Sequence, residues 1–247
     1  MRKSLKKFVF ALIVLGLFFG SVGVALADLS VTSVDGDWAN AVGGKNVIIL
    51  NDQAPDGRVA TASWGEAASW WNKNPARSSY VFESIITPFK APTDGTAFSL
   101  GTFTHNNFPI PSGSGITGIK LLFNLGIEGF SALSTTFVYS HNETPNNSSP
   151  PSNPSNNDIV TITNPVLNAH FISGGNDYYF SLLGFSQDGG ATISNVFSTI
   201  ENQANSAQLY GIITTTPIPT PTPIPAAIWL LGSGLVGLIG VRRRFTK

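Results

Sequence analysis

Short runs of apolar and β-branched residues alternate with clusters of Gly, Asn, Asp, Ser and Pro from residue 28 to about residue 216. Several runs place apolar residues at every second position, a period typical of strands with one buried face, and none keeps a 3.6-residue period. The pattern predicts strands at Leu29–Val34, Asn46–Leu50, Arg58–Trp64, Ser79–Ile85, Phe98–His105, Gly118–Leu125, Thr135–Ser140, Ile159–Ile162, His170–Ile172, Tyr178–Gly184, Val196–Ile200 and Gln208–Thr214.

Turn-forming dipeptides fall between the predicted strands, and they are Asp35-Gly36, Asp94-Gly95, Gly174-Gly175 and Asp188-Gly189. Many short strands with frequent turns are typical of antiparallel all-β domains. We therefore predict an all-β fold, a single antiparallel β-sandwich of jelly-roll-like type over residues 28–216. Gly65–Asn72 is the one stretch expected to form one or two helical turns.

Residues 142–158 are polar and rich in Pro, Asn and Ser. Such a segment has almost nothing to bury and cannot offset the entropy of ordering its backbone. We predict a disordered surface loop between two strands, not a domain boundary.

The N-terminus has the layout of a secretory signal peptide. Basic residues precede an apolar stretch at Phe8–Gly20, which is shorter than the roughly 20 residues of a membrane span. Ala25 and Ala27 then form a small-x-small cleavage site. The pattern predicts a signal peptide at residues 1–27 and a mature chain beginning at Asp28.

The C-terminal segment predicts a stalk, a membrane helix and a basic stop. Pro217–Pro225 alternates Pro with Ile or Thr, which favours an extended polyproline stalk of about 28 Å. Residues 226–247 follow as a predicted transmembrane helix with a basic tail that contains Arg242, Arg243 and Arg244. Because basic residues stay on the cytoplasmic side, the body is expected to be held outside the inner membrane. The apolar stretch is short and rich in glycine, which favours a temporary anchor.

The same tail resembles a known sorting signal, the VPLPA variant of the PEP-CTERM type. The residues that carry the resemblance are Thr222, Pro223, Ile224, Pro225 and Ala226, followed by the three arginines. The sequence departs from the motif at Thr222, where Val is usual, and at Ile224, where Leu is usual. The resemblance implies recognition by an exosortase-type sorting protease, and a bacterial host that makes exopolysaccharide.

The body contains Thr104-His105-Asn106-Asn107, and it is similar to the THxN family of PEP-CTERM proteins, which overlaps the choice-of-anchor K domains. Further residues support the resemblance, namely Trp64-Gly65, Glu143 with the three residues after it, Asp158 and Glu201-Asn202. The resemblance implies a β-sandwich without an assigned activity. It makes Thr104, His105, Asn107 and Glu143 the family-motif residues.

Charge and composition exclude several classes of function. All 14 acidic residues and only six basic ones lie in the predicted mature body, giving it a net charge of −8. Nucleic-acid binding and docking on anionic lipid both need a basic face, so neither is expected. With no Cys the chain has no disulfides, thiolate metal sites or cysteine nucleophile.

The three histidines, His105, His141 and His170, have no spacing that indicates a zinc site. We predict that His105 is structural and satisfies backbone groups where a strand ends. No cofactor is expected. Calcium stays open because Asp35, Asp37 and Asp158 place oxygen ligands in expected loops, although Asp is also an ordinary turn residue.

Two rival functions remain beside a non-enzymatic, exported surface or matrix protein. A carbohydrate-binding module would use exposed aromatic rings, and adjacent Trp70 and Trp71 cannot both face inward on a strand. A glycan hydrolase would need two converging carboxylates. The candidates, Glu83, Glu128, Glu143 and Glu201, contain no pair that a motif marks out, so we predict no catalytic residues.

Overall fold

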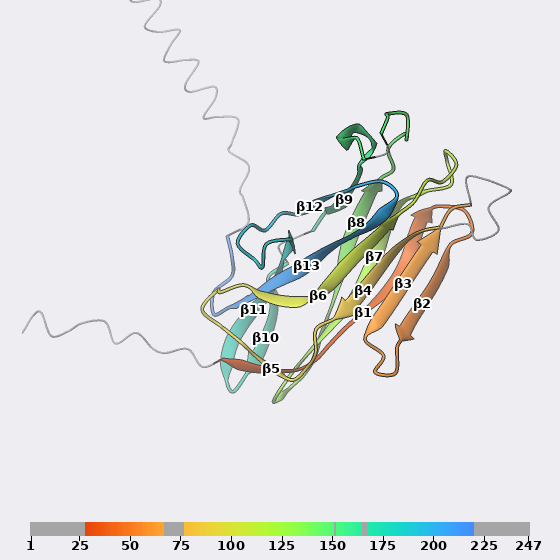
Figure 1. Ribbon diagram of the computed structural model, residues 1–247. Coiled ribbons are helices and arrows are strands. Elements are labelled where there is room, and N and C mark those ends of the chain that lie inside the picture. The colour runs from red at the N-terminus through yellow and green to blue at the C-terminus, as the bar shows by residue number, and fades with distance from the viewer. Residues whose placement is uncertain (1–27, 67–76, 151, 165–166, 220–247) are drawn as a thin grey trace, which may run out of the picture. The chain divides into compact units, whose positions relative to one another are not determined.

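The computed structural model describes residues 28–66, 77–150, 152–164 and 167–219 (Figure 1). These residues form two curled antiparallel sheets, which confirms the all-β class and is consistent with a β-sandwich. The six-stranded sheet has the order β12-β9-β8-β7-β1-β5 and the seven-stranded sheet the order β10-β11-β13-β6-β4-β3-β2.

The strands of the six-stranded sheet are β1 (Leu29–Gly43), β5 (Phe89–Ala91), β7 (Ile116–Ile127), β8 (Phe130–Asn142), β9 (Asp158–Ile162) and β12 (Val196–Thr199). Those of the other sheet are β2 (Ile48–Gln53), β3 (Val59–Trp64), β4 (Ser78–Ser84), β6 (Phe98–Asn107), β10 (Ala169–Ser173), β11 (Asn176–Ser186) and β13 (Gln203–Thr214). Every predicted strand overlaps one of these. The short edge strand β5 was missed because its three residues are too few to show a period.

One predicted turn is wrong. Asp35-Gly36 lies inside β1, paired with β7, and not at a chain reversal. Gly36 is needed there for a different reason, since a Cβ at this position would lie 2.7 Å from two ring atoms of Phe82 on the opposite sheet. The glycine therefore marks a close approach of the two sheets.

Aromatic side chains from both sheets fill the interior. Trp38 and Tyr139 come from the six-stranded sheet, with ring centroids 5.4 Å apart, and Phe103 of the other sheet stacks on Tyr139 at 5.7 Å. The indole Nε1 of Trp38 donates to the backbone carbonyl of Ala60, 3.1 Å away. Trp38 and Trp64 are both buried, so neither offers a ring to the surface.

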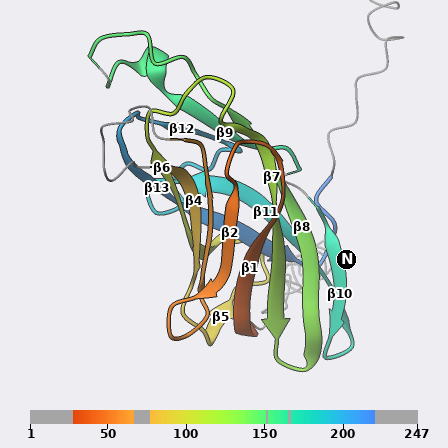
Figure 2. The same cartoon turned by 90° about the vertical axis from the view of Figure 1, so that its right-hand side faces the viewer.

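The segment between β8 and β9 projects beyond one end of the strands (Figure 2). It does join two strands, but it buries more than its composition predicts. It contains a short 3₁₀ helix, η1 (Pro154–Asn156), and buries Asn156 almost completely. The Asn156 side chain accepts from the Ser148 backbone N–H at 3.0 Å and donates to the Ser148 carbonyl at 2.8 Å. Paired backbone groups of this kind replace hydrogen bonds to water.

Several predicted features lie outside the described residues. These are the signal peptide, Trp70 and Trp71, the sorting motif from Thr222 onward, and the predicted membrane span. Among the residues that the structure does describe, no helix is long and apolar enough to cross a membrane. The chain divides into one compact unit that ends at Thr216 and a second that begins at Pro217.

Candidate functional site

Strand alternation explains how the Thr-His-x-Asn motif presents its side chains. On β6, Phe103, His105 and Asn107 face the interior, while Thr104 faces outward and shares a hydrogen bond with Ser206 at 2.8 Å. Every second residue of a strand points to the same face, so the motif delivers one imidazole and one amide into the core.

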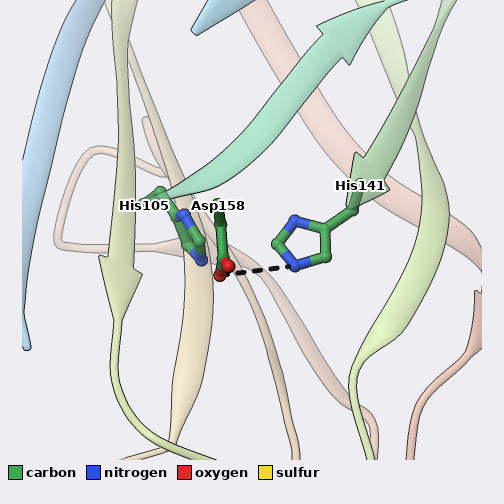
Figure 3. Close-up of side chains that lie close together, drawn as sticks. All are labelled: His105, His141 and Asp158. Atoms are coloured by element: carbon green, nitrogen blue, oxygen red, sulfur yellow. Dashed lines mark ion pairs between the residues drawn. The ribbon is translucent and has the colours of Figure 1, made fainter. Parts of the chain in front are cut away.

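Two further strands bring partners to His105. His141 lies on β8 at the inward position after Tyr139, and Asp158 is the first inward residue of β9. One ligand atom each of His105, His141 and Asp158 lies within 4.8 Å of the other two (Figure 3). All three side chains are buried. The fold therefore assembles a group that spans both sheets and that sequence spacing did not indicate.

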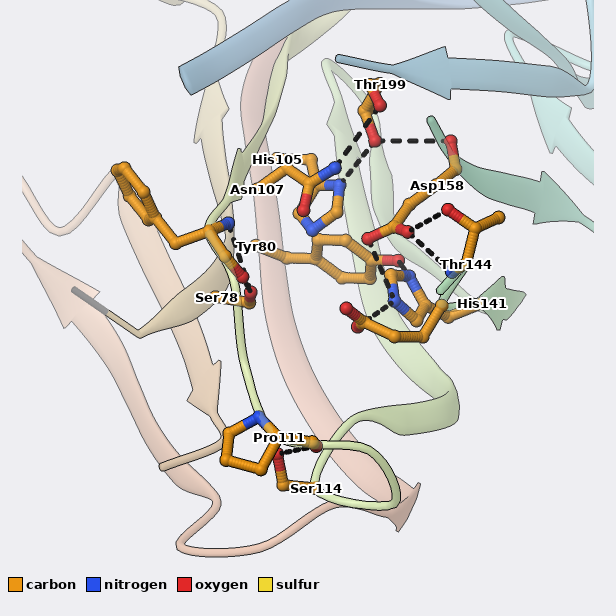
Figure 4. Close-up of polar contacts among 12 residues, drawn as sticks. Ser78, Tyr80, His105, Asn107, Pro111, Ser114, His141, Thr144, Asp158 and Thr199 are labelled. Atoms are coloured by element: carbon orange, nitrogen blue, oxygen red, sulfur yellow. Dashed lines mark hydrogen bonds and ion pairs between the residues drawn. The ribbon is translucent and has the colours of Figure 1, made fainter. Parts of the chain in front are cut away.

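A frame of hydrogen bonds holds these three side chains (Figure 4). The Thr199 hydroxyl donates to the backbone carbonyl of Asp158 at 3.3 Å and lies 2.8 Å from Nδ1 of His105. The Tyr80 hydroxyl lies 2.5 Å from Nδ1 of His141. Oδ1 of Asp158 accepts from the backbone N–H of Thr144 at 2.8 Å and from its hydroxyl at 3.3 Å.

Aromatic rings form the inner wall of the group. The Trp64 ring stacks on His105 with centroids 5.9 Å apart and meets His141 edge-on at 5.5 Å. Tyr80 contacts both imidazoles, and the two imidazoles are perpendicular at 5.2 Å. An apolar wall of this kind excludes water and fixes the orientation of each imidazole.

Three carboxyl groups gather at this end of the sandwich, and each titrates well above its ordinary range. Burial raises the pKa of Glu143 to about 7. Burial and the charge of Glu143 raise the pKa of Asp158 to about 6. Burial, with the charges of Asp158 and Glu143, raises the pKa of Glu201 to about 7, against the amides of Asn146 and Asn107. Within the described ranges, no lysine or arginine forms an ion pair with any of the three.

The histidines shift in the opposite direction. Burial lowers the pKa of His141 to about 4, although the charge of Asp158 opposes the shift. Burial, and then the proximity of His141, lowers the pKa of His105 well below its ordinary value. Both shifts favour the neutral imidazole, which has one protonated and one unprotonated ring nitrogen.

Several buried polar atoms of the group make no hydrogen bond with any described residue. They are Nε2 of His105, Oδ1 of Asn107, Oε1 of Glu143 and Oδ2 of Asp158. A buried polar atom left without a partner costs about 1–3 kcal/mol. Most buried polar atoms of folded proteins have a partner, so several without one at a single place call for an explanation.

A cavity of about 480 Å³ adjoins the group, and His141 and Glu143 are part of its wall. The rest of the wall comes from the β6–β7 connection and the start of the β8–β9 loop, with Thr117, Asn146 and Asn147 among its polar residues. Oε2 of Glu143 lies 3.2 Å from Nε2 of His141. Glu143 and His141 thus meet at the wall of the cavity.

The remaining candidates lie elsewhere. Asp35 and Asp37 are on β1, not in a loop, and they approach Asp52 rather than Asp158. Asp158 is not in a loop either, because it begins β9. His170 is exposed and pairs with Asp177 at 2.7 Å. The predicted calcium candidates therefore do not form one site, although Asp35, Asp37 and Asp52 have ligand atoms within 4.8 Å of one another.

Of the proposed hydrolase carboxylates, Glu143 and Glu201 both belong to the group, while Glu83 faces Arg58 at 3.5 Å. Three members of the site were not predicted from the sequence, namely Tyr80, His141 and Thr199. The inward position of His141 could have been predicted from strand alternation, because Phe137, Tyr139 and His141 share one face of β8. Tyr80 and Thr199 carry no such signal.

No family model matches the chain, and no curated protein matches it either. The site is therefore interpreted from its own geometry.

Proposed function

We propose that this chain is an exported, non-enzymatic protein of the cell surface or the exopolysaccharide matrix, delivered by an exosortase-type sorting system. One observation carries the proposal. The compact unit ends at Thr216, and the Pro-rich segment begins at Pro217. Removal of residues 1–27 and of the tail would therefore leave every strand of the sandwich in place. The THxN and PEP-CTERM resemblances support the same reading.

Carbohydrate binding is the second candidate, and the cavity beside Glu143 favours it. Its wall offers amides and hydroxyls from Thr117, Asn142, Asn146 and Asn147, which suit the hydroxyl groups of a sugar. Trp38 and Trp64, the tryptophans among the described residues, are buried and cannot serve as stacking platforms. A tryptophan platform in this body would have to come from Trp70 or Trp71, outside the described residues.

A glycan hydrolase is less well supported. Glu143, Asp158 and Glu201 do converge, but Asp158 and Glu201 are buried and only Glu143 is part of the cavity wall. Hydrolysis needs two carboxyl groups that both reach the glycosidic bond. The arrangement therefore favours binding over catalysis.

Mass spectrometry of surface or released material tests the proposed function. The mature protein should begin Asp-Leu-Ser-Val at Asp28 and lack every peptide from Trp229 to Lys247. Deleting the exosortase, or replacing Arg242–Arg244 with Ser, should leave unprocessed precursor in the inner membrane. A mature fraction dominated by intact Arg242–Arg244 peptides would show that the tail is a permanent anchor.

A further inference from the structure

We propose that His105, His141 and Asp158 bind one divalent transition-metal ion, Zn²⁺ by preference, through Nε2 of each imidazole and Oδ2 of the carboxylate. The three ligand atoms already lie within 4.8 Å of one another (Figure 3). They come from β6, β8 and β9, so rigid strands position all three. This inference goes beyond the proposed function, which does not depend on a metal.

The hydrogen bonds of Thr199 identify the free nitrogen of His105. A backbone carbonyl can only accept, so the single proton of the Thr199 hydroxyl goes to the carbonyl of Asp158. Nδ1 of His105 must then donate to the Thr199 oxygen, 2.8 Å away. Nε2 is left as a bare lone pair, and it has no hydrogen-bond partner among the described residues. A buried imidazole nitrogen with an unshared lone pair can bind a metal ion directly.

His141 is held in a similar way at Nδ1, although its Nε2 already meets Oε2 of Glu143 at 3.2 Å. Its Nδ1 lies 2.5 Å from the Tyr80 hydroxyl, which can accept the Nδ1 proton. Nε2 of His141 then faces the carboxyl groups, 3.2 Å from Oε2 of Glu143 and 3.8 Å from Oδ2 of Asp158, so a bound metal ion would replace the contact with Glu143. In metal sites, an outer hydrogen bond of this kind to the second ring nitrogen fixes the tautomer and orientation of the ligand.

One carboxyl oxygen of Asp158 is held by hydrogen bonds, and the other is left to bind the metal ion. Thr144 holds Oδ1 through its backbone N–H and its hydroxyl. Oδ2 makes no hydrogen bond within the described part of the chain and points at His141 (Figure 3). A carboxylate fixed at one oxygen in this way is pre-organised to bind a cation through the other.

Carboxyl groups without a basic partner gather at this site. Asp158 and Glu201 are buried, and Oε2 of Glu143 lies 3.2 Å from Nε2 of His141. No lysine or arginine of the described ranges pairs with these carboxyls. A divalent ion would satisfy the free lone pairs and the charge together.

The donor set favours a transition metal over calcium. Two imidazoles and one carboxylate suit Zn²⁺ and other first-row transition metals, whereas Ca²⁺ takes six to eight oxygen ligands. Sites with nitrogen ligands also bind Zn²⁺ more tightly than Mn²⁺ or Fe²⁺. A set of three protein ligands leaves a fourth position, and Glu143 is the polar side chain that adjoins His141 on the cavity side.

Metal titration of the full chain, purified in mild detergent and stripped with EDTA, tests the proposal. We expect elemental analysis to find one Zn²⁺ per chain after reconstitution and dialysis, and calorimetry to give a single binding step. Asp158→Asn keeps the side-chain shape and an oxygen for Thr144, and it should weaken Zn²⁺ binding by roughly 100-fold or more. Thr199→Val removes the hydrogen bonds of the Thr199 hydroxyl to His105 and to the Asp158 carbonyl but no metal ligand, and it should weaken binding about 10- to 100-fold.

Two controls separate this site from others. His170→Ala removes the exposed histidine, and Asp35→Asn alters the second acidic group, so both should bind Zn²⁺ like the wild type. If Asp158→Asn does not fold, Thr199→Val carries the test, with near-ultraviolet circular dichroism as the check of folding. A folded wild-type chain that binds no Zn²⁺ would overturn the proposal. Binding that only Asp35→Asn weakens would overturn it as well.

Discussion

The hydroxyl of Thr199 lies 2.8 Å from Nδ1 of His105, although the two residues belong to different sheets. The same hydroxyl donates to the carbonyl of Asp158. A single side chain at the end of β12 therefore connects a histidine of the other sheet with the start of β9. A substitution at Thr199 therefore tests both of these hydrogen bonds at once.

Replacing Thr199 with Val should lower the free energy of unfolding by about 1–3 kcal/mol, because Nδ1 of His105 would keep its proton but lose its acceptor in a buried site. Chemical denaturation of the EDTA-treated protein measures the change. Thr161→Val is the matched control, since Thr161 lies on the outward face of β9 and should change stability by less than about 0.5 kcal/mol. Equal stability of Thr199→Val and wild type would contradict this role.

Gly36→Ala should destabilise the sandwich by about 1–3 kcal/mol, since the new methyl group would meet the Phe82 ring at 2.7 Å. Thermal unfolding of the single variant measures the cost. Phe82→Leu alone should also destabilise, but in combination it should recover part of the loss caused by Gly36→Ala. Strictly additive effects of the two changes would show that the clash does not limit stability.

Most of the fold could be predicted from the sequence, because the alternation of apolar residues marks each long strand. The site could be predicted only in part. His105 and Asn107 stand out in the motif, yet their partners come from β8, β9 and β12, and the pairing of strands decides which residues meet. The turn predicted at Asp35-Gly36 was wrong for a related reason. The sequence does not distinguish a glycine needed for a turn from a glycine needed for close packing of two sheets. Nothing local distinguishes Thr199 from any other strand threonine.

Glu201→Gln should stabilise the metal-free protein at pH 8 and have little effect at pH 5. The pKa of Glu201 is raised from 4.5 to about 7, so the folded state binds its proton more tightly than the unfolded state does. That contribution is present at low pH and is lost as the pH rises toward 7, where a buried charge must form. We expect a gain of roughly 1 kcal/mol at pH 8.

Unfolding curves at the two pH values measure the effect of Glu201→Gln. Glu83→Gln is the control, because Glu83 is half-exposed beside Arg58. A stabilisation by Glu201→Gln that is the same at pH 5 and pH 8 would mean that the carboxyl does not titrate between them.

Asn156→Ala should loosen the β8–β9 segment without unfolding the sandwich, because Asn156 bonds to the backbone of Ser148 within the segment. Limited proteolysis should cut this variant several-fold faster than wild type between residues 144 and 157, while the two fragments stay associated. Asn157→Ala serves as the control, since the Asn157 side chain bonds to Ser198 instead. Identical cleavage rates in all three proteins would show that Asn156 does not hold the segment.

X-ray diffraction at the zinc absorption edge, from crystals of the Zn²⁺-reconstituted protein, tests the central claim most directly. The account predicts one anomalous peak, about 2.0–2.2 Å from Nε2 of His105, Nε2 of His141 and Oδ2 of Asp158. A peak beside Asp35, Asp37 and Asp52 with none between the two histidines, or no peak at all, would contradict it.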